Sequence, residues 1–179
     1  MSYIIHKNIL TPNIIQHLKN LLKDLDFFIG KDMDETAEKI FNKDFKFQGM
    51  LRITTNQNNV TDKNLYDRLN DIAFIVTEIV CKKSNINLKR IQRFMWNFYK
   101  QGEEGTFHID NPDENFYTIV YSLNTSDGYL EINNQKIYDI EDEAKIFKSN
   151  ILHKGVGPTK DNFRLNLNII LEANNEAKS

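Results

Sequence analysis

The placement of glycine and proline along the chain constrains its fold more than any other feature. Five of the seven glycines and two of the three prolines fall between Gly102 and Pro158. They separate short runs rich in Phe, Tyr, Ile and Val, a pattern typical of many short strands. The runs that we expect to form strands are 91–99, 106–110, 116–123, 128–132, 135–139, 144–148 and 163–171. About eight strands within roughly 80 residues predict a compact sandwich or barrel.

The first half of the chain has a helical pattern instead. Thr11 followed by Pro12 is a typical helix start, and it precedes apolar residues at helical spacing, namely Ile14, Ile15, Leu18, Leu21, Leu22 and Leu25. Thr61 or Asp62 can cap a second, longer helix, whose apolar stripe consists of Leu65, Leu69, Ile72, Ala73, Val76, Ile79 and Val80. A short strand is expected over 50–54. Both helices are expected to pack on a sheet.

The length of 179 residues suits one domain with its own core, because a chain of this size buries most of the surface that it exposes when unfolded. We therefore expect a single domain over 1–179. Within it we expect a helical support region over 1–90, a strand-rich core over 91–171 and a flexible, polar tail over 172–179.

Charge and cysteine content narrow the function classes. With 23 basic and 25 acidic residues the net charge is −2, so no large positive field is available for non-specific nucleic-acid binding. The one cysteine, Cys81, cannot form an internal disulfide, which favours a reducing cytoplasm. No signal peptide or membrane span is recognisable. We expect a cytoplasmic protein without nucleic-acid or membrane partners, as a monomer or weak homodimer.

Two histidines of the strand-rich half stand beside a carboxylate. His108 and Asp110 are two residues apart, so on an extended chain their side chains project from the same face. With His153 from a later strand they would form a triad of two histidines and one carboxylate, which suits Fe(II) because it leaves three coordination positions open. The His-x-Asp tripeptide alone occurs by chance in many proteins.

The run that begins at Arg164 has two unlike faces. Arg164, Asn166 and Asn168 share one face, and the other is apolar, consisting of Leu165, Leu167, Ile169 and Leu171. A guanidinium buried without a partner is costly, and a dicarboxylate reaching from the metal would supply a bidentate partner. The alternative is a solvent-facing edge strand with an arginine on the surface.

Taken together, the stretch from about Arg93 to Leu171 resembles the Fe(II)- and 2-oxoglutarate-dependent dioxygenases, in particular their prolyl 4-hydroxylase-like branch. The segments that carry the resemblance are Tyr99 before the turn at Gly102 and Gly105, the run 108–112, the strand 117–124, the segment 127–132, and the stretch 146–158 that contains His153 and leads to Arg164.

The resemblance implies a mainly β fold with N-terminal helices (α+β), a double-stranded β-helix (jelly roll, cupin-like) with the helices packed on its major sheet. Residues 91–171 would form the jelly-roll catalytic core. His108, Asp110 and His153 would bind Fe(II), and Arg164 would bind the far carboxylate of 2-oxoglutarate. The activity would be hydroxylation of an unactivated C–H bond with O2 as co-substrate, coupled to decarboxylation of 2-oxoglutarate to succinate and CO2. Ascorbate is a candidate additional cofactor.

The resemblance and strand parity extend this expected site. If Arg164 points inward, so do Thr118 and Ser122. Ser122 takes the hydroxyl-bearing position of the family, but the adjacent Tyr121 is an alternative contact for 2-oxoglutarate. The remaining candidates for contact with the co-substrate are Tyr99, which could equally be a core residue of its strand, and Asn166, which stands where some members carry serine.

Two departures from the family pattern stand out. Asp127-Gly128 replaces the paired glycine after the third strand, and 141–143 replace a proline-containing turn. The loops expected to cover the substrate, 26–60 and 111–116, match nothing that identifies it. A protein or peptide side chain such as proline is favoured over a small molecule, but both stay open.

Other functions are also open. Asp110 argues against carrier-linked halogenases, and the lack of an arginine beyond Arg164 argues against nucleic-acid demethylases. A non-catalytic jelly roll that serves as a binding or structural module, for example in a virus acting in the host cytoplasm, is one alternative. A zinc hydrolase with the same three ligands is another.

Overall fold

The structure of the chain is a computed structural model that describes residues 3–23, 49–51 and 63–174. Strands dominate it. The elements in chain order are β1 (Tyr3–Lys7), α1 (Pro12–Lys23), β2 (Gly49–Leu51), α3 (Lys63–Ser84), β3 (Leu88–Lys100), β4 (Phe116–Ser122), β5 (Ser126–Ile132), β6 (Gln135–Asp139), β7 (Glu143–Lys148), β8 (His153–Val156) and β9 (Phe163–Ala173).

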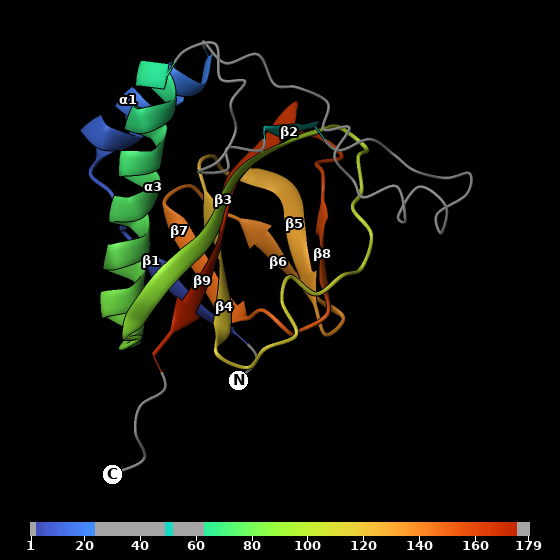
Figure 1. Cartoon of the computed structure of the whole chain (residues 1–179). Helices are drawn as coiled ribbons and strands as arrows, with labels where there is room; N and C mark the ends of the chain where they lie inside the picture. The colour runs from blue at the N-terminus through green and yellow to red at the C-terminus, as the bar shows by residue number, and fades with distance from the viewer. Residues whose placement is uncertain (1–2, 24–48, 52–62, 175–179) are drawn as a thin grey trace.

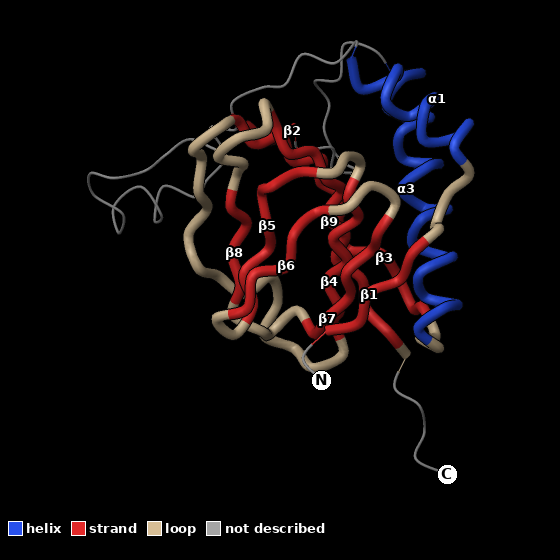
Figure 2. Tube along the Cα trace, turned by 180° about the vertical axis from the view of Figure 1, so that it is seen from behind, coloured by secondary structure: helices blue, strands red, loops and turns tan. Residues whose placement is uncertain are grey.

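The strands form two facing antiparallel sheets. The larger sheet has the order β1-β7-β4-β9-β3-β2, and the smaller has the order β6-β5-β8. In Figures 1 and 2 the smaller sheet lies on one side of the larger sheet and the helices lie on the other. This arrangement is the expected jelly roll, a double-stranded β-helix with helices on its major sheet.

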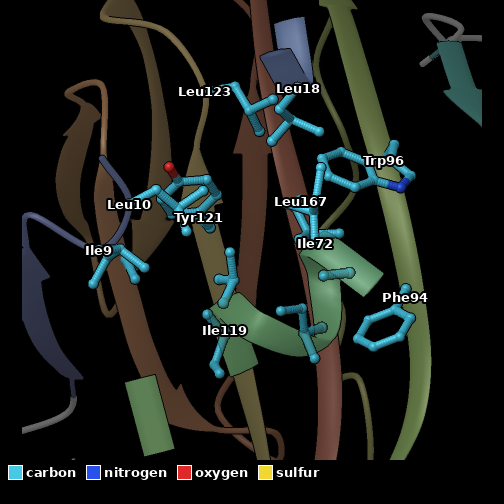
Figure 3. Close-up of a cluster of buried hydrophobic side chains, with 14 of the residues drawn as sticks. Ile9, Leu10, Leu18, Ile72, Phe94, Trp96, Ile119, Tyr121, Leu123 and Leu167 are labelled. Atoms are coloured by element: carbon cyan, nitrogen blue, oxygen red, sulfur yellow. The ribbon is translucent and has the colours of Figure 1, made fainter. Parts of the chain in front are cut away.

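A continuous apolar layer joins the helices to the larger sheet. Leu18 of α1 and Ile72 of α3 pack against Trp96 of β3 and Leu167 of β9, and all four are almost completely buried (Figure 3). Burying side chains of this size contributes roughly 1.5–3 kcal/mol each, so this layer holds the helices in place. Phe94 lies in the same layer.

The helix boundaries agree with the sequence patterns where the structure describes them. α1 begins at Pro12, and the carbonyl of Thr11 accepts the first helical hydrogen bond from the backbone N–H of Ile15 at 3.1 Å. Leu25 and the expected capping residues of the second helix lie outside the described residues. Cys81 is buried near the end of α3. No helix in the described part is long and apolar enough to cross a membrane.

The structure corrects several expected boundaries. β1 was not expected, yet it pairs with β7 along the edge of the larger sheet, so the segment 1–90 is not purely helical. The segment 106–110 is not a regular strand, because its only ladder contact is a single bridge from His108 to His153. β9 continues to Ala173, so Glu172 and Ala173 belong to a strand and not to a flexible tail, and 175–179 lie outside the described residues.

Candidate functional site

The inner face of the larger sheet, which looks toward the smaller sheet, carries buried polar side chains beside an apolar cluster that contains Val120 and Phe147. Arg164, Asn166 and Asn168 of β9 lie on it, and all three are buried. β9 pairs with β4 on one side and β3 on the other, so it lies inside the sheet. The alternative of an edge strand with a surface arginine is therefore wrong. The leucines of β9 face the helices, as the alternation predicts.

His108, Asp110 and His153 come together at one end of this interior. Each offers one ligand atom, and these atoms all lie within 4.8 Å of one another. The Nε2 atoms of His108 and His153 are 3.7 and 3.4 Å from the two carboxylate oxygens of Asp110. The backbone brings them together, because His108 and His153 exchange two N–H···O bonds of 2.9 and 3.0 Å. Two imidazoles and one carboxylate at this spacing could hold one divalent metal ion.

Each imidazole is held by a hydrogen bond to the backbone carbonyl two residues before it in the chain. Nδ1 of His108 bonds to the carbonyl of Thr106 at 2.9 Å, and Nδ1 of His153 bonds to the carbonyl of Ile151 at 2.8 Å. A carbonyl only accepts, so each Nδ1 carries a proton, and Nε2 of each ring lies toward Asp110. With Nδ1 occupied in this way, Nε2 is the nitrogen of each ring that is placed to bind a metal. Partial burial and the nearby His153 also lower the pKa of His108.

Asp110 is fixed from three sides. The hydroxyl of Thr118 donates to one carboxylate oxygen at 2.7 Å, and Nη2 of Arg93 donates to the other at 3.1 Å. Its backbone N–H donates to the carbonyl of Ser149. Burial by itself would raise the pKa of Asp110, but the neighbouring His153 ring and the hydrogen bond from Thr118 outweigh it and bring the pKa to about 2. The carboxylate is therefore charged at neutral pH.

Arg164 lies deeper in the interior, on the same face as Tyr99, its partner across the strands. Its Nε donates to Oδ2 of Asp139 at 2.7 Å, and its guanidinium lies 4.7 Å from the centre of the Tyr99 ring. Burial disfavours the charge, but Asp139 raises the pKa of Arg164 above its usual value. Nη1 is buried without a hydrogen-bond partner among the described residues. A buried N–H without a partner is costly, so this atom marks a place for an acceptor.

Two charged residues that sequence reasoning missed complete this cluster. Asp139, at the end of β6, and Lys145 of β7 are both fully buried. Nζ of Lys145 donates to Oδ1 of Asp139 and to the hydroxyl of Ser122, both at 2.7 Å. Alternation along the predicted strand 144–148 could have found Lys145, because it puts the apolar Ala144 and Ile146 on the helix side and Lys145 on the inner face.

Two glycines of the smaller sheet allow this cluster to fit. A β-carbon at Gly128 would lie 2.7 Å from Cδ of Arg164, and one at Gly155 would lie 2.9 Å from its Nη1. Real β-carbons do not approach other atoms this closely. Residues 128 and 155 therefore need to be glycine for Arg164 to occupy its present position.

The other predicted site residues divide by face. Ser122 lies against Lys145, Thr118 against Asp110, and Asn166 accepts a hydrogen bond from the amide of Asn97 at 3.1 Å. Tyr121 lies on the opposite face, in the apolar layer under the helices (Figure 3), and its hydroxyl donates to Asp142 at 2.9 Å. Of the two hydroxyl residues expected to compete for one role, only Ser122 is on the same face as Arg164.

Of the loops expected to cover a substrate, 111–116 lies among the described residues and 26–60 lies outside them except for 49–51. Within 111–116, the side chain of Asn111 accepts a hydrogen bond from the backbone of Asp113, which in turn caps the backbone of Asn115. This segment leads directly from Asp110 into β4. It therefore forms a compact turn beside the histidine and aspartate cluster.

Comparison with known proteins gives a likeness in structure alone. No protein-family model matches the sequence, and no curated protein matches it. The structure is similar to an oxidoreductase of the 2OG-Fe(II) oxygenase family from Burkholderia pseudomallei, with a TM-score of 0.70 and 13% identity over 98% of this chain and 86% of that one.

Two further solved structures are similar. A prolyl hydroxylase from Trichoplax adhaerens in complex with a hypoxia inducible factor peptide has a TM-score of 0.65 and 18% identity, over 96% of this chain and 83% of that one. The non-heme alpha-ketoglutarate-dependent carbocyclase SnoK from nogalamycin biosynthesis has a TM-score of 0.63 and 9% identity, over 96% and 79%. The chain thus has the double-stranded β-helix fold seen in these oxygenases.

Proposed function

We propose that this protein is an Fe(II)- and 2-oxoglutarate-dependent dioxygenase that hydroxylates an unactivated C–H bond. The observation that carries the proposal is the pairing of two features in one barrel interior. His108, Asp110 and His153 form a cluster that fits a divalent metal ion, and Arg164 presents an unpartnered, buried Nη1 on the same inner face. A zinc hydrolase would need the first feature but not the second.

Each residue has a distinct task in this proposal. His108, Asp110 and His153 hold the metal, and their Nδ1 and Thr118 hydrogen bonds keep the three ligands oriented. Arg164 binds the distal carboxylate of 2-oxoglutarate, where the low polarity of the surroundings strengthens the ion pair. Bound Fe(II), with 2-oxoglutarate and O2, would supply the oxidative chemistry that yields succinate, CO2 and the hydroxylated product.

For the substrate we propose a side chain of a protein or peptide, such as proline, with a small molecule as the alternative. The similar structures include both a prolyl hydroxylase and a carbocyclase from nogalamycin biosynthesis, so the fold accommodates both classes. We further propose that the protein acts in the cytoplasm as a monomer or weak homodimer, without nucleic-acid partners.

An anaerobic titration tests the function. Apo-protein is loaded with Fe(II) and then titrated with 2-oxoglutarate, and the visible metal-to-ligand charge-transfer band is recorded. We expect the band in the wild type, none in His153→Ala, and about 10-fold or more 2-oxoglutarate needed for half-saturation in Arg164→Met.

His17→Ala is the matched control, because His17 lies on the surface and contacts Arg68 instead. It should behave as the wild type does. A metal-loaded wild type that gives no band would overturn the proposal and leave a binding module or hydrolase. Where the band forms, succinate release in the presence of proline-containing peptides and of small metabolites then separates the two substrate classes.

A further inference from the structure

The deepest part of the barrel interior holds three charged side chains in direct contact. Arg164, Asp139 and Lys145 are 1%, 1% and 0% exposed. Asp139 is at the centre: one carboxylate oxygen accepts from Nε of Arg164 and the other from Nζ of Lys145, each at 2.7 Å. Two cations from two different strands therefore flank a single carboxylate. We refer to these three residues as the charge cluster.

The charge cluster does not balance. Two positive charges against one negative charge leave an excess of one positive charge in a fully buried place. Two other buried carboxylates have cations of their own, because Asp110 pairs with Arg93 and Glu143 pairs with Lys7. A buried charge without compensation is strongly unfavourable, and one further carboxylate would neutralise this one.

The charge cluster also has unused hydrogen-bond donors. Nη1 of Arg164 has no partner among the described residues. Lys145 has three N–H groups, and the bonds to Asp139 and Ser122 account for two of them. Since the hydroxyl oxygen of Ser122 accepts from Lys145, its hydrogen is free to donate in turn. Three donors on neighbouring side chains thus match the needs of one carboxylate group.

We infer that Lys145 is a second cationic ligand for the distal carboxylate of the co-substrate, and that Asp139 is a positioning residue that holds Lys145 beside Arg164. The inference rests on the proposed function. It assigns the preference for a 2-oxo dicarboxylic acid over a 2-oxo monocarboxylic acid to Lys145 and Arg164 jointly. Asp139 reduces the repulsion between the two cations while no co-substrate is bound.

The expected effect of removing Lys145 differs if the charge cluster has only a structural role. If Asp139 only neutralises two cations that support the fold, removing Lys145 leaves a neutral Arg164 and Asp139 pair, and co-substrate binding depends on Arg164 alone. If Lys145 is a ligand, the same change removes the excess charge and one donor, and binding of a dicarboxylate weakens. Because Asp139 keeps Arg164 as its partner in either case, Lys145→Met creates no unpaired charge and should fold.

Isothermal titration calorimetry of the Mn(II)-loaded protein separates these cases without any turnover. Two probes are compared: 2-oxoglutarate, and 2-oxopentanoate, which has the same five-carbon chain but no distal carboxylate. For Lys145→Met we expect the Kd of 2-oxoglutarate to rise by about 10- to 100-fold, and that of 2-oxopentanoate to change by less than about 3-fold. The preference for the dicarboxylate should fall by the same factor.

Lys148→Met is the matched control. Lys148 is on the same strand, but its Nζ bonds to the backbone carbonyl of Glu114 and lies over the ring of Tyr117, away from the charge cluster. It should bind both probes as the wild type does. Should Lys145→Met fail to fold, Lys145→Gln carries the same test, because its amide can still donate while the charge is lost.

The outcomes separate the two proposals. If the wild type prefers 2-oxoglutarate and Lys145→Met keeps that preference in full, the inference is wrong and the proposed function stands. If the wild type binds 2-oxoglutarate no better than 2-oxopentanoate, the co-substrate assignment itself fails and the inference fails with it. A loss of preference in Lys145→Met but not in Lys148→Met supports both.

Discussion

Gly155 on β8 lies so close to Tyr99 on β3 that a β-carbon at position 155 would be 2.2 Å from the Tyr99 hydroxyl oxygen. The same β-carbon would be 2.9 Å from Nη1 of Arg164. The missing side chain of the smaller sheet is thus what allows two side chains of the larger sheet to reach the interior. The glycine at position 155 of β8 therefore affects the position of Arg164, the residue expected to bind the co-substrate.

Replacing Gly155 by alanine should therefore disturb the site. Tyr99 is buried and has no solvent-filled space to turn into, so the new methyl group should displace both Tyr99 and Arg164. We expect the free energy of unfolding to fall by about 1–3 kcal/mol and the Kd for 2-oxoglutarate to rise by about 10-fold or more. Urea unfolding and calorimetry of the Mn(II)-loaded protein measure the two effects.

Gly102→Ala is the control for Gly155→Ala. Gly102 has a φ of 78°, and nothing lies within 4 Å of the position of its β-carbon. Its substitution should lower stability by about 1–2 kcal/mol through backbone strain alone and leave the Kd unchanged. An unchanged Kd in Gly155→Ala as well would show that the close approach has no bearing on co-substrate binding.

Thr118→Val should weaken metal binding. The change removes the hydroxyl that donates to Asp110 but keeps the shape of the side chain, so the carboxylate loses one of the bonds that orient it. Loss of such a supporting bond typically lowers metal affinity by about 10- to 100-fold. Titration with Mn(II) measures it, and Thr77→Val is the control.

Thr77 is a suitable control because it is as deeply buried as Thr118 but does not contact Asp110. The hydroxyl of Thr77 is also buried and donates to the carbonyl of Ala73 within α3, on the side of the larger sheet away from the smaller sheet (Figure 1). Both variants should lose a similar free energy of unfolding, about 1 kcal/mol, but only Thr118→Val should lose metal affinity. Equal Mn(II) affinities in both variants would show that Thr118 does not support Asp110.

Local spacing predicts part of the arrangement of His108, Asp110 and His153, whose possible ligand atoms lie close together in the structure. His108 and Asp110 are two residues apart, and the carbonyls that hold His108 and His153 are each two residues before them. Parity on β9 likewise predicts that Arg164 and the neighbouring leucines point in opposite directions. Periodicity therefore suffices wherever a role depends on which face of an element a residue occupies.

Periodicity fails where a role depends on a distant partner. β1 is a short edge strand whose pairing with β7 joins residues about 140 positions apart, and two of its isoleucines are exposed. Asp139 and Lys145 would be expected on the surface as single residues. Alternation can place Lys145 on the inner face, but no local pattern reveals that it pairs with Asp139, and that pairing makes the burial of both tolerable.

Asp127 stands where the dioxygenases that the sequence resembles have a glycine, and its side chain forms hydrogen bonds that stabilise a turn. Its carboxylate accepts hydrogen bonds from the hydroxyl and backbone N–H of Thr159 and from the backbone N–H groups of Lys160 and Asp161. These bonds hold the connection between β8 and β9, and they keep the pKa of Asp127 below its usual value. The carboxylate thus closes the turn that precedes Arg164.

The stabilising effect of Asp127 should depend on pH. Because the pKa of Asp127 is lower in the folded than in the unfolded state, its contribution is fully present above the unfolded pKa of about 3.9 and is lost as the pH falls toward the folded value. Asp127→Asn should therefore be less stable than the wild type at pH 7. The difference should shrink as the pH falls from about 5 to 3 in urea titrations.

Asp71→Asn is the control for Asp127→Asn, because Asp71 is on the exposed face of α3. It should leave the free energy of unfolding at pH 7 nearly unchanged. A difference between Asp127→Asn and the wild type that stays constant between pH 7 and pH 3 would mean that the carboxylate charge does not hold the turn.

Asp139→Asn should make the protein depend on its co-substrate for stability. Without the resident carboxylate, Arg164 and Lys145 are two buried cations that repel each other, and breaking a buried ion pair costs about 3–5 kcal/mol. The melting temperature of the apo-protein should fall by on the order of 10 °C.

The co-substrate should restore part of this loss. The distal carboxylate of 2-oxoglutarate supplies a negative charge between the same two cations, so saturating 2-oxoglutarate should raise the melting temperature of the Mn(II)-loaded variant more than that of the wild type. Saturating 2-oxopentanoate, which brings no second carboxylate, should raise the melting temperature of both proteins equally. A variant that gains no more from 2-oxoglutarate than from 2-oxopentanoate would mean that the distal carboxylate does not approach the place that Asp139 holds.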